Sequence, residues 1–149
     1  MARKRMFSLD VVDTDAFLEM PPSTQALYFH LGLRADDDGF IANPNRIISY
    51  IGATRDDMRI LITKKFLIPM GESGVYIITH WKVNNTIRHD RHTPSLYADK
   101  LNMLTEMSDK SYALKDEYAS GMVDMVATAK LPPKNENVEI STVEENDKD

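Results

Sequence analysis

The sequence predicts an α+β fold that is mainly helical, with several helices around a small core and one short β-hairpin. Apolar residues recur at helical spacing in segments that begin at capping residues and end at proline or glycine. Two apolar runs, residues 67–70 and 75–79, flank a glycine-bounded tip at residues 71–74, which is typical of a β-hairpin. The 149 residues suffice for one domain with a short extension and are too few for two ordinary domains.

Two helices, a turn and a strand are expected first. Asp13 or Thr14 caps a short helix that runs through Met20 and ends at a pair of prolines. Ser23 caps a longer helix that runs to Arg34. Residues 36–39, with the sequence Asp-Asp-Asp-Gly, predict a turn because Asp and Gly tolerate the backbone angles that turns require. Residues 40–42 are apolar and long enough for a very short strand.

Two further helices follow and are separated by a tight turn. The first has Asn43 as its cap and Pro44 at its first position, and it stops at Gly52. Thr54 caps the second, and Asp57 three residues later resembles the partner of a capping box. The apolar stripe of this second helix consists of Met58, Leu61, Ile62 and Phe66. A short glycine-containing turn between two helices is what a helix-turn-helix motif needs.

The C-terminal third is expected to be helical and then disordered. Helices are predicted over residues 95–107 and, broken by a glycine, over 114–129, so that residues 98–130 form a C-terminal helical extension. The residues expected to be buried on the first of these helices are Leu96, Met103 and Leu104. Residues 131–149 form an acidic tail with too little apolar surface to offset the entropy of ordering, which predicts disorder.

The charge of the chain is unevenly distributed. Residues 1–100 hold 13 Lys and Arg against 12 Asp and Glu, whereas residues 101–149 hold 5 against 11. The formal net charge of −5 therefore reflects the C-terminal third, and it does not argue against a nucleic-acid partner for the first hundred residues.

The order of the elements narrows the fold class. Helix, short strand, helix, tight turn, helix and hairpin is the order of a winged helix-turn-helix with a two-stranded wing. The expected domain covers residues 1–97, which contain enough apolar sequence for a three-helix core and the wing.

Three blocks of the sequence strengthen this prediction. They are MARKRMFSLDVVDTDAFLEMPPSTQALYFHLGLRADDDGFI, NPNRIISYIGA and SGVYIITHWKVNNTIRHDRHTPSLY. Together they resemble the N-terminal domain of phage replisome organisers, which are related to the primosome protein DnaD, over about residues 1–105. The resemblance implies a phage or prophage protein of replication initiation that binds double-stranded DNA, contacts host or phage replication proteins and forms a homodimer or higher oligomer.

In this fold the helix that begins at Thr54 would enter the major groove of DNA. Arg55 and Arg59 lie one turn apart on one side of it, and Thr63 follows one turn later. Arginine suits guanine because its planar fork reaches O6 and N7 together. The alternative is an ordinary solvated helix face. Lys64, near the end of the helix, can contact phosphate or complement the helix dipole.

Other basic residues are candidates for phosphate contacts. Asn45 and Arg46 begin the preceding helix, which would cross the DNA backbone. The wing tip at residues 71–74 has no Lys or Arg, which predicts weak groove contact there. The remaining candidates are Lys82, Arg88 and Arg91 in a basic stretch, and Arg3, Lys4 and Arg5 at the N-terminus. The alternative for the basic stretch is a solvated connector.

Other functional classes find little support in the sequence. No phosphate-binding glycine loop, catalytic serine motif or complete metal-ligand set occurs, so we expect neither an enzyme nor a cofactor or metal. The lack of cysteine fits the cytoplasm of a bacterial host, and no apolar run is long enough to predict a membrane span.

Two other functions remain open at this point. The same compact domain could be a protein-binding inhibitor of a host defence nuclease or of a host replication protein, which the acidic C-terminal third and the wing without cations favour. A transcriptional repressor is a third option, which the fold alone does not exclude.

Overall fold

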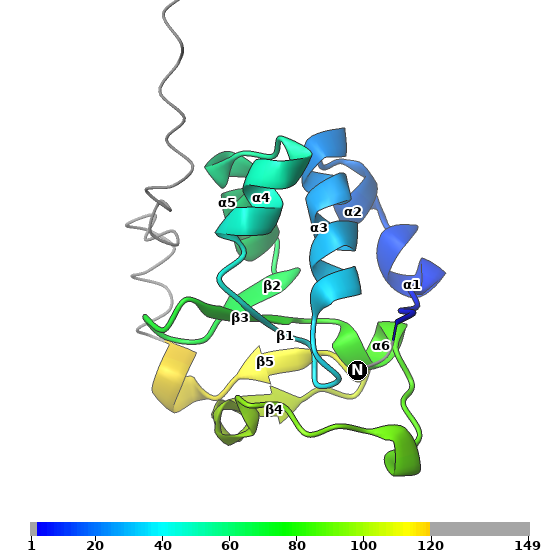
Figure 1. Cartoon of the computed structure of the whole chain (residues 1–149), viewed down its shortest axis with the longest axis vertical. Coiled ribbons are helices and arrows are strands. Elements are labelled where there is room, and N and C mark those ends of the chain that lie inside the picture. Colours follow the sequence, from blue (N-terminus) through cyan, green and yellow to red (C-terminus); the bar gives the residue numbers. More distant parts are fainter. Residues whose placement is uncertain (1–2, 120–149) are drawn as a thin grey trace, which may run out of the picture.

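Two antiparallel β-sheets and a group of helices make up the computed structural model, which describes residues 3–119 (Figure 1). The chain is an α+β protein. Its helices are α1 (Leu9–Val12), α2 (Asp15–Leu18), α3 (Pro22–Arg34), α4 (Asn45–Ile51), α5 (Arg55–Thr63) and α6 (Trp81–Asn84), with 3-10 turns η1 (His89–Arg91) and η2 (Ala98–Met103). Its strands are β1 (Phe40–Ala42), β2 (Leu67–Pro69), β3 (Val75–Ile78), β4 (Leu104–Glu106) and β5 (Tyr112–Leu114).

The larger sheet has the order β1–β3–β2 and is antiparallel throughout. Strand β3 lies in the centre, where Ile77 pairs with Phe40 of β1 and with Ile68 of β2. Figure 1 shows α3, α4 and α5 on one side of this sheet and the β4–β5 hairpin on the other. The backbone amide of Tyr112 donates to the carbonyl of Thr79 (2.8 Å), which ties β5 to the end of β3.

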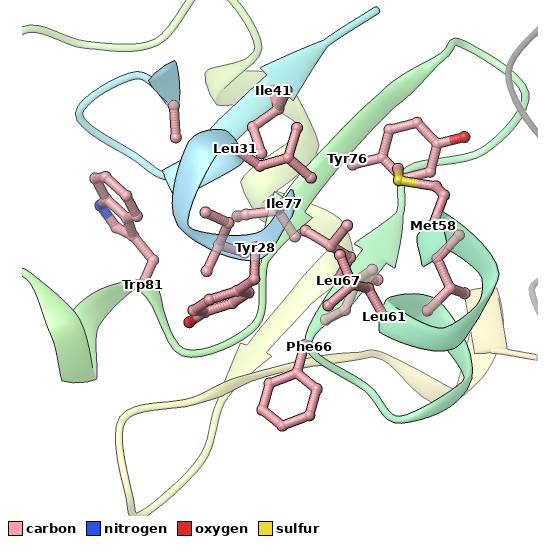
Figure 2. Packing of buried hydrophobic residues seen from close by; sticks show 14 of the residues in the cluster. Tyr28, Leu31, Ile41, Met58, Leu61, Phe66, Leu67, Tyr76, Ile77 and Trp81 are labelled. Carbon is pink, nitrogen blue, oxygen red and sulfur yellow. The ribbon is translucent and has the colours of Figure 1, made fainter. Parts of the chain in front are cut away.

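The core lies between the helices and the larger sheet. All four residues of β3 are buried, and side chains from α3, α5, β1 and β2 converge on it (Figure 2). The ring of Tyr28 lies fully inside, with its centroid 5.3 Å from that of Phe17 and 5.8 Å from that of Phe66. These edge-on aromatic contacts join α2, α3 and the turn between α5 and β2.

Most predicted boundaries agree with the structure. The capping box of Thr54 and Asp57 is present, and Gly52 ends α4 with a φ of 70°, a left-handed conformation that glycine adopts without strain. Two starts differ by one or two residues. Helix α3 has Pro21 instead of Ser23 at its cap position, and α4 has Pro44 instead of Asn43. Proline is accommodated there because the first turn of a helix has no partner for its amide.

The prediction of a helix over residues 95–107 is wrong. The segment forms η2 and then strand β4, which pairs with β5 so that Leu104 faces Leu114. Leu96, expected to be buried, is 93% exposed, whereas Tyr112 is buried. The Asp109 carboxylate accepts hydrogen bonds from the amide and hydroxyl of Ser111, which favours a turn and a hairpin over a continuing helix.

The helical extension predicted for residues 98–130 therefore needs correction. A hairpin occupies its first part, and only residues 116–119 are helical among those that the structure describes beyond β5. The remainder of the extension and the predicted tail, residues 131–149, lie outside the described residues.

Candidate nucleic-acid interface

A buried carboxylate positions the start of helix α5. The Thr54 hydroxyl oxygen accepts a hydrogen bond from the Asp57 amide (3.2 Å), and Asp57 Oδ2 accepts one from the Thr54 amide (2.9 Å). Asp57 Oδ1 also accepts hydrogen bonds from the hydroxyls of Ser23 (2.8 Å) and Thr24 (2.6 Å) at the start of α3. One side chain therefore completes the capping box and fixes α5 to α3.

These hydrogen bonds determine the ionisation of Asp57. Burial alone would raise the pKa of this carboxyl, but the hydrogen bonds donated by the Thr24 hydroxyl and the Thr54 amide outweigh it, and the pKa is lower than usual. Spacing in the sequence identified Asp57 as a capping residue. Its second role was missed because Ser23 and Thr24 lie more than 30 residues away in the chain.

The exposed face of α5 carries Asp56, Arg59 and Thr63. Arg59 Nη1 lies 3.0 Å from Asp56 Oδ1, in a pair whose side chains are 46% and 76% exposed. Exposed ion pairs of this kind contribute little free energy, so Arg59 can exchange Asp56 for another anion at small cost. Arg55 is half-buried. Burial raises the pKa of Tyr76 to about 12, and the positive charge of Arg55 opposes this rise. Of the two arginines predicted to face DNA, Arg59 is thus the more accessible.

Helix α4 presents a second exposed cation beside α5. Arg46 and Tyr50 lie one helical turn apart, and the guanidinium carbon of Arg46 is 5.4 Å from the centroid of the Tyr50 ring. Both residues are exposed, whereas Asn45 at the start of the helix is half-buried. Arg46 is therefore accessible to phosphate, as predicted, and it shares its surface with the exposed ring of Tyr50.

Lys64 and the tip of the β2–β3 hairpin are less suited to DNA contacts. Lys64 Nζ lies 3.8 Å from a carboxylate oxygen of Glu19 and donates to the carbonyl of Ala16 (3.5 Å), so this side chain is directed toward α2. The tip between β2 and β3, residues 71–74, carries Glu72 as its charged residue. Contacts with a duplex would therefore depend on α4 and α5.

The prediction that Arg5 contacts DNA is wrong, because its side chain is only 2% exposed. Its guanidinium donates to Asp37 Oδ1 (2.9 Å) and to the carbonyl of Ala35 (2.8 Å), and it lies 5.0 Å from the centroid of the Trp81 ring. Arg3 and Lys4 are exposed. The N-terminal basic tripeptide thus contains one structural residue and two solvated ones.

The basic stretch after β3 is largely paired with acids of the same chain. Lys82 Nζ lies 2.9 Å from Glu106 Oε2, and that hydrogen bond raises the pKa of Lys82. Arg88 Nε lies 3.2 Å from Asp90 Oδ1 in an exposed pair. Arg91 is exposed. This stretch is closer to the alternative of a connector than to a continuous phosphate-binding surface.

The acidic turn after α3 has a larger role than a simple turn. The Asp37 carboxylate accepts a hydrogen bond from the Thr93 amide (3.0 Å) and the Asp38 carboxylate one from the Ser95 amide (2.9 Å). His92 Nε2 lies 2.7 Å from Asp38 Oδ1. The turn therefore holds the segment that follows the basic stretch, and no local sequence signal indicates this pairing across more than 50 residues.

The structure separates the predicted contact residues into two groups. Figure 1 shows α4 and α5 at one end of the molecule, and the N-terminus and α6 toward the other. Arg46, Arg59 and Thr63 belong to the first group, and Arg3, Lys4 and Lys82 to the second. They do not form one continuous basic surface, and the exposed face of α4 and α5 is the candidate interface.

Within residues 3–119, no group of three His, Asp or Glu side chains is placed to hold a metal ion. Over the same residues, no helix has the length and apolar character needed to cross a bilayer. No protein-family model, curated protein or solved structure matches this chain.

Proposed function

We propose that the chain is a DNA-binding protein whose α3, α4 and α5 and β2–β3 hairpin act as a winged helix-turn-helix. The observation that carries the proposal is the tight turn at Gly52, after which α5 buries Met58 and Leu61 and leaves Arg59 and Thr63 exposed. In helix-turn-helix proteins the second helix of such a pair reads base edges in the major groove.

The rigidity of the helix pair supports this function. Asp57 bonds α5 to α3, so an exposed arginine on α5 is held on a fixed support, as sequence reading requires. Arg46 on α4 is accessible to phosphate beside it. Together with the resemblance to phage replisome organisers, these features favour a role in replication initiation, with double-stranded DNA as the partner.

Replacing Arg59 by alanine is expected to weaken duplex binding by about 1–3 kcal/mol if the arginine contacts a base. The measurement is a titration of fluorescent duplexes that tile the candidate phage origin, repeated at several salt concentrations. A protein that neutralises phosphates should show affinity that falls steeply with added salt.

A matched control for Arg59→Ala is Lys110→Gln, which removes an exposed cation from the β4–β5 turn on the other side of the sheet. This variant should bind duplex DNA as the unmodified chain does. Equal affinities of Arg59→Ala and the unmodified chain would exclude α5 as the reading helix.

One observation favours a second function, which is the binding of a host protein as an inhibitor. Asp56 is 76% exposed on the same face as Arg59, and Glu72 lies at the wing tip, so carboxylates stand where DNA phosphates would approach. Such a surface also suits a basic groove on a protein partner.

The variant Asp56→Asn separates the two functions. If α5 docks on DNA, removal of this carboxylate should strengthen duplex binding by roughly 1 kcal/mol, because one repulsive charge near phosphate is lost. If α5 docks on a basic protein, duplex binding is absent at physiological salt and Asp56→Asn weakens the capture of that protein. Thermal melting of the variant checks that loss of the helix-start charge, worth about 0.3–1 kcal/mol, leaves the fold intact.

A further inference from the structure

A groove of about 510 Å³ lies between the end of α3, strand β1 and helix α4. Its apolar lining includes Ile41, Ile47 and Ile51, and its cationic lining consists of Arg34 and Arg46. No carboxylate is among the described residues that line it. The groove is large enough for a ligand of nucleotide size, and its charge favours an anionic one.

An exposed aromatic platform borders this groove. Tyr50 lines it and is 77% exposed, and the Arg46 guanidinium lies over its ring. The ring and the guanidinium are both planar groups on successive turns of α4. Arg34 uses Nη1 for hydrogen bonds to the carbonyl and ring of His30, so it is held near the groove while other guanidinium donors remain.

The apolar groove, the exposed ring of Tyr50 and the two arginines suit an unpaired nucleotide better than a base-paired one. An aromatic ring offers a surface on which any base can stack, and neighbouring arginines meet the phosphates, which is how proteins hold single strands. In a duplex the faces of the bases are already stacked on one another and are inaccessible to Tyr50. An acidic peptide would satisfy the arginines but would leave the exposed ring without a stacking partner.

We infer that this groove binds single-stranded DNA, with a base stacked on Tyr50 and phosphates near Arg34 and Arg46. The inference rests on the proposed function, because it treats the chain as a DNA-binding protein. It adds single-stranded DNA as a second ligand beside the duplex. A protein that holds a duplex through α5 and an unpaired strand beside α4 would suit a site where the two strands begin to separate.

The test is fluorescence anisotropy of a labelled oligo-dT, with the full chain at several salt concentrations. Tyr50→Ala should weaken binding roughly five- to 150-fold, the loss expected for one stacked base. Tyr50→Phe keeps the ring and should retain affinity within about twofold. Tyr118→Ala is the matched control, because Tyr118 is an exposed tyrosine outside the groove. Circular dichroism verifies that each variant folds.

The outcomes separate the inference from the proposed function. Oligo-dT binding that depends on Tyr50 supports the inference. If oligo-dT binds in this way and a duplex does not, the proposal for α5 fails and the inference stands. Duplex binding without oligo-dT binding, or equal loss in Tyr50→Ala and Tyr118→Ala, overturns the inference and leaves the α5 proposal standing. Displacement of the oligo-dT by a synthetic peptide of residues 131–149, with no effect of Tyr50→Ala, also overturns it in favour of an acidic peptide.

Discussion

Replacing Arg5 by alanine is expected to lower the free energy of unfolding by about 3–5 kcal/mol, because it breaks a buried ion pair. Arg5 and Asp37 form an ion pair whose side chains are 2% and 3% exposed. Burial alone would raise the pKa of Asp37, but the Thr93 amide and the Arg5 guanidinium hold it below its usual range. Without Arg5 the buried Asp37 carboxylate would keep the hydrogen bond from the Thr93 amide but would have lost the cation that balances its charge. Urea unfolding at pH 7 measures the loss.

Two comparisons make this prediction specific. Arg3→Ala removes an exposed cation two residues away and should change stability by less than about 0.5 kcal/mol. The double variant Arg5→Met with Asp37→Asn should be more stable than the sum of the single losses predicts, because neither charge is then left alone. Similar stabilities of Arg3→Ala and Arg5→Ala would contradict the structural role of Arg5.

Replacing Asp57 by alanine is expected to cost about 3 kcal/mol of the free energy of unfolding. The change removes charge-assisted hydrogen bonds to Ser23, Thr24 and Thr54, and it leaves the fully buried Thr24 hydroxyl without its acceptor. Asp57→Asn should cost less, since an amide can accept from the Thr54 backbone and donate to the two hydroxyls. Chemical denaturation of both variants measures the difference.

The pH dependence of Asp57 provides a second measurement of the same contact. Its folded pKa lies below the value of about 3.9 in the unfolded chain, so its contribution is present above about pH 5. That contribution is lost as the pH falls through 3.9 toward the folded pKa. Asp57→Asn should therefore lose less stability between pH 5 and pH 3 than the unmodified chain. Asp56→Asn, at an exposed neighbour, should retain the steeper decline, and equal declines in the two variants would refute the assignment.

Local signals were sufficient to predict most of the helical part of the fold. The boundaries around Gly52 and Thr54 depend on conformations and hydrogen bonds within three or four residues, which a single sequence displays. The β2–β3 hairpin was predicted for the same reason. The exposed position of Arg59 followed from the helical period once the stripe of Met58 and Leu61 was recognised.

Long-range pairing accounts for what the sequence did not reveal. Arg5 looked like its exposed neighbours because its partner Asp37 is 32 residues away. The stretch around Leu104 has a helical pattern, yet pairing of β4 with β5 and burial of Tyr112 against the end of β3 decide its conformation. The groove beside α4 also depends on tertiary structure, since the end of α3, strand β1 and α4 all contribute to it.

The attachment of the N-terminal segment to α6 also has a consequence for synthesis on the ribosome. The amides of Met6 and Ser8 donate to the side chains of Asn85 and Asn84, which follow 79 and 76 residues later. At translation rates of 5–20 residues per second, the first residues wait roughly 4–16 s for these partners. Nascent chains that end before α6 therefore lack both acceptors, and the amides of Met6 and Ser8 remain hydrated until translation supplies the two asparagines.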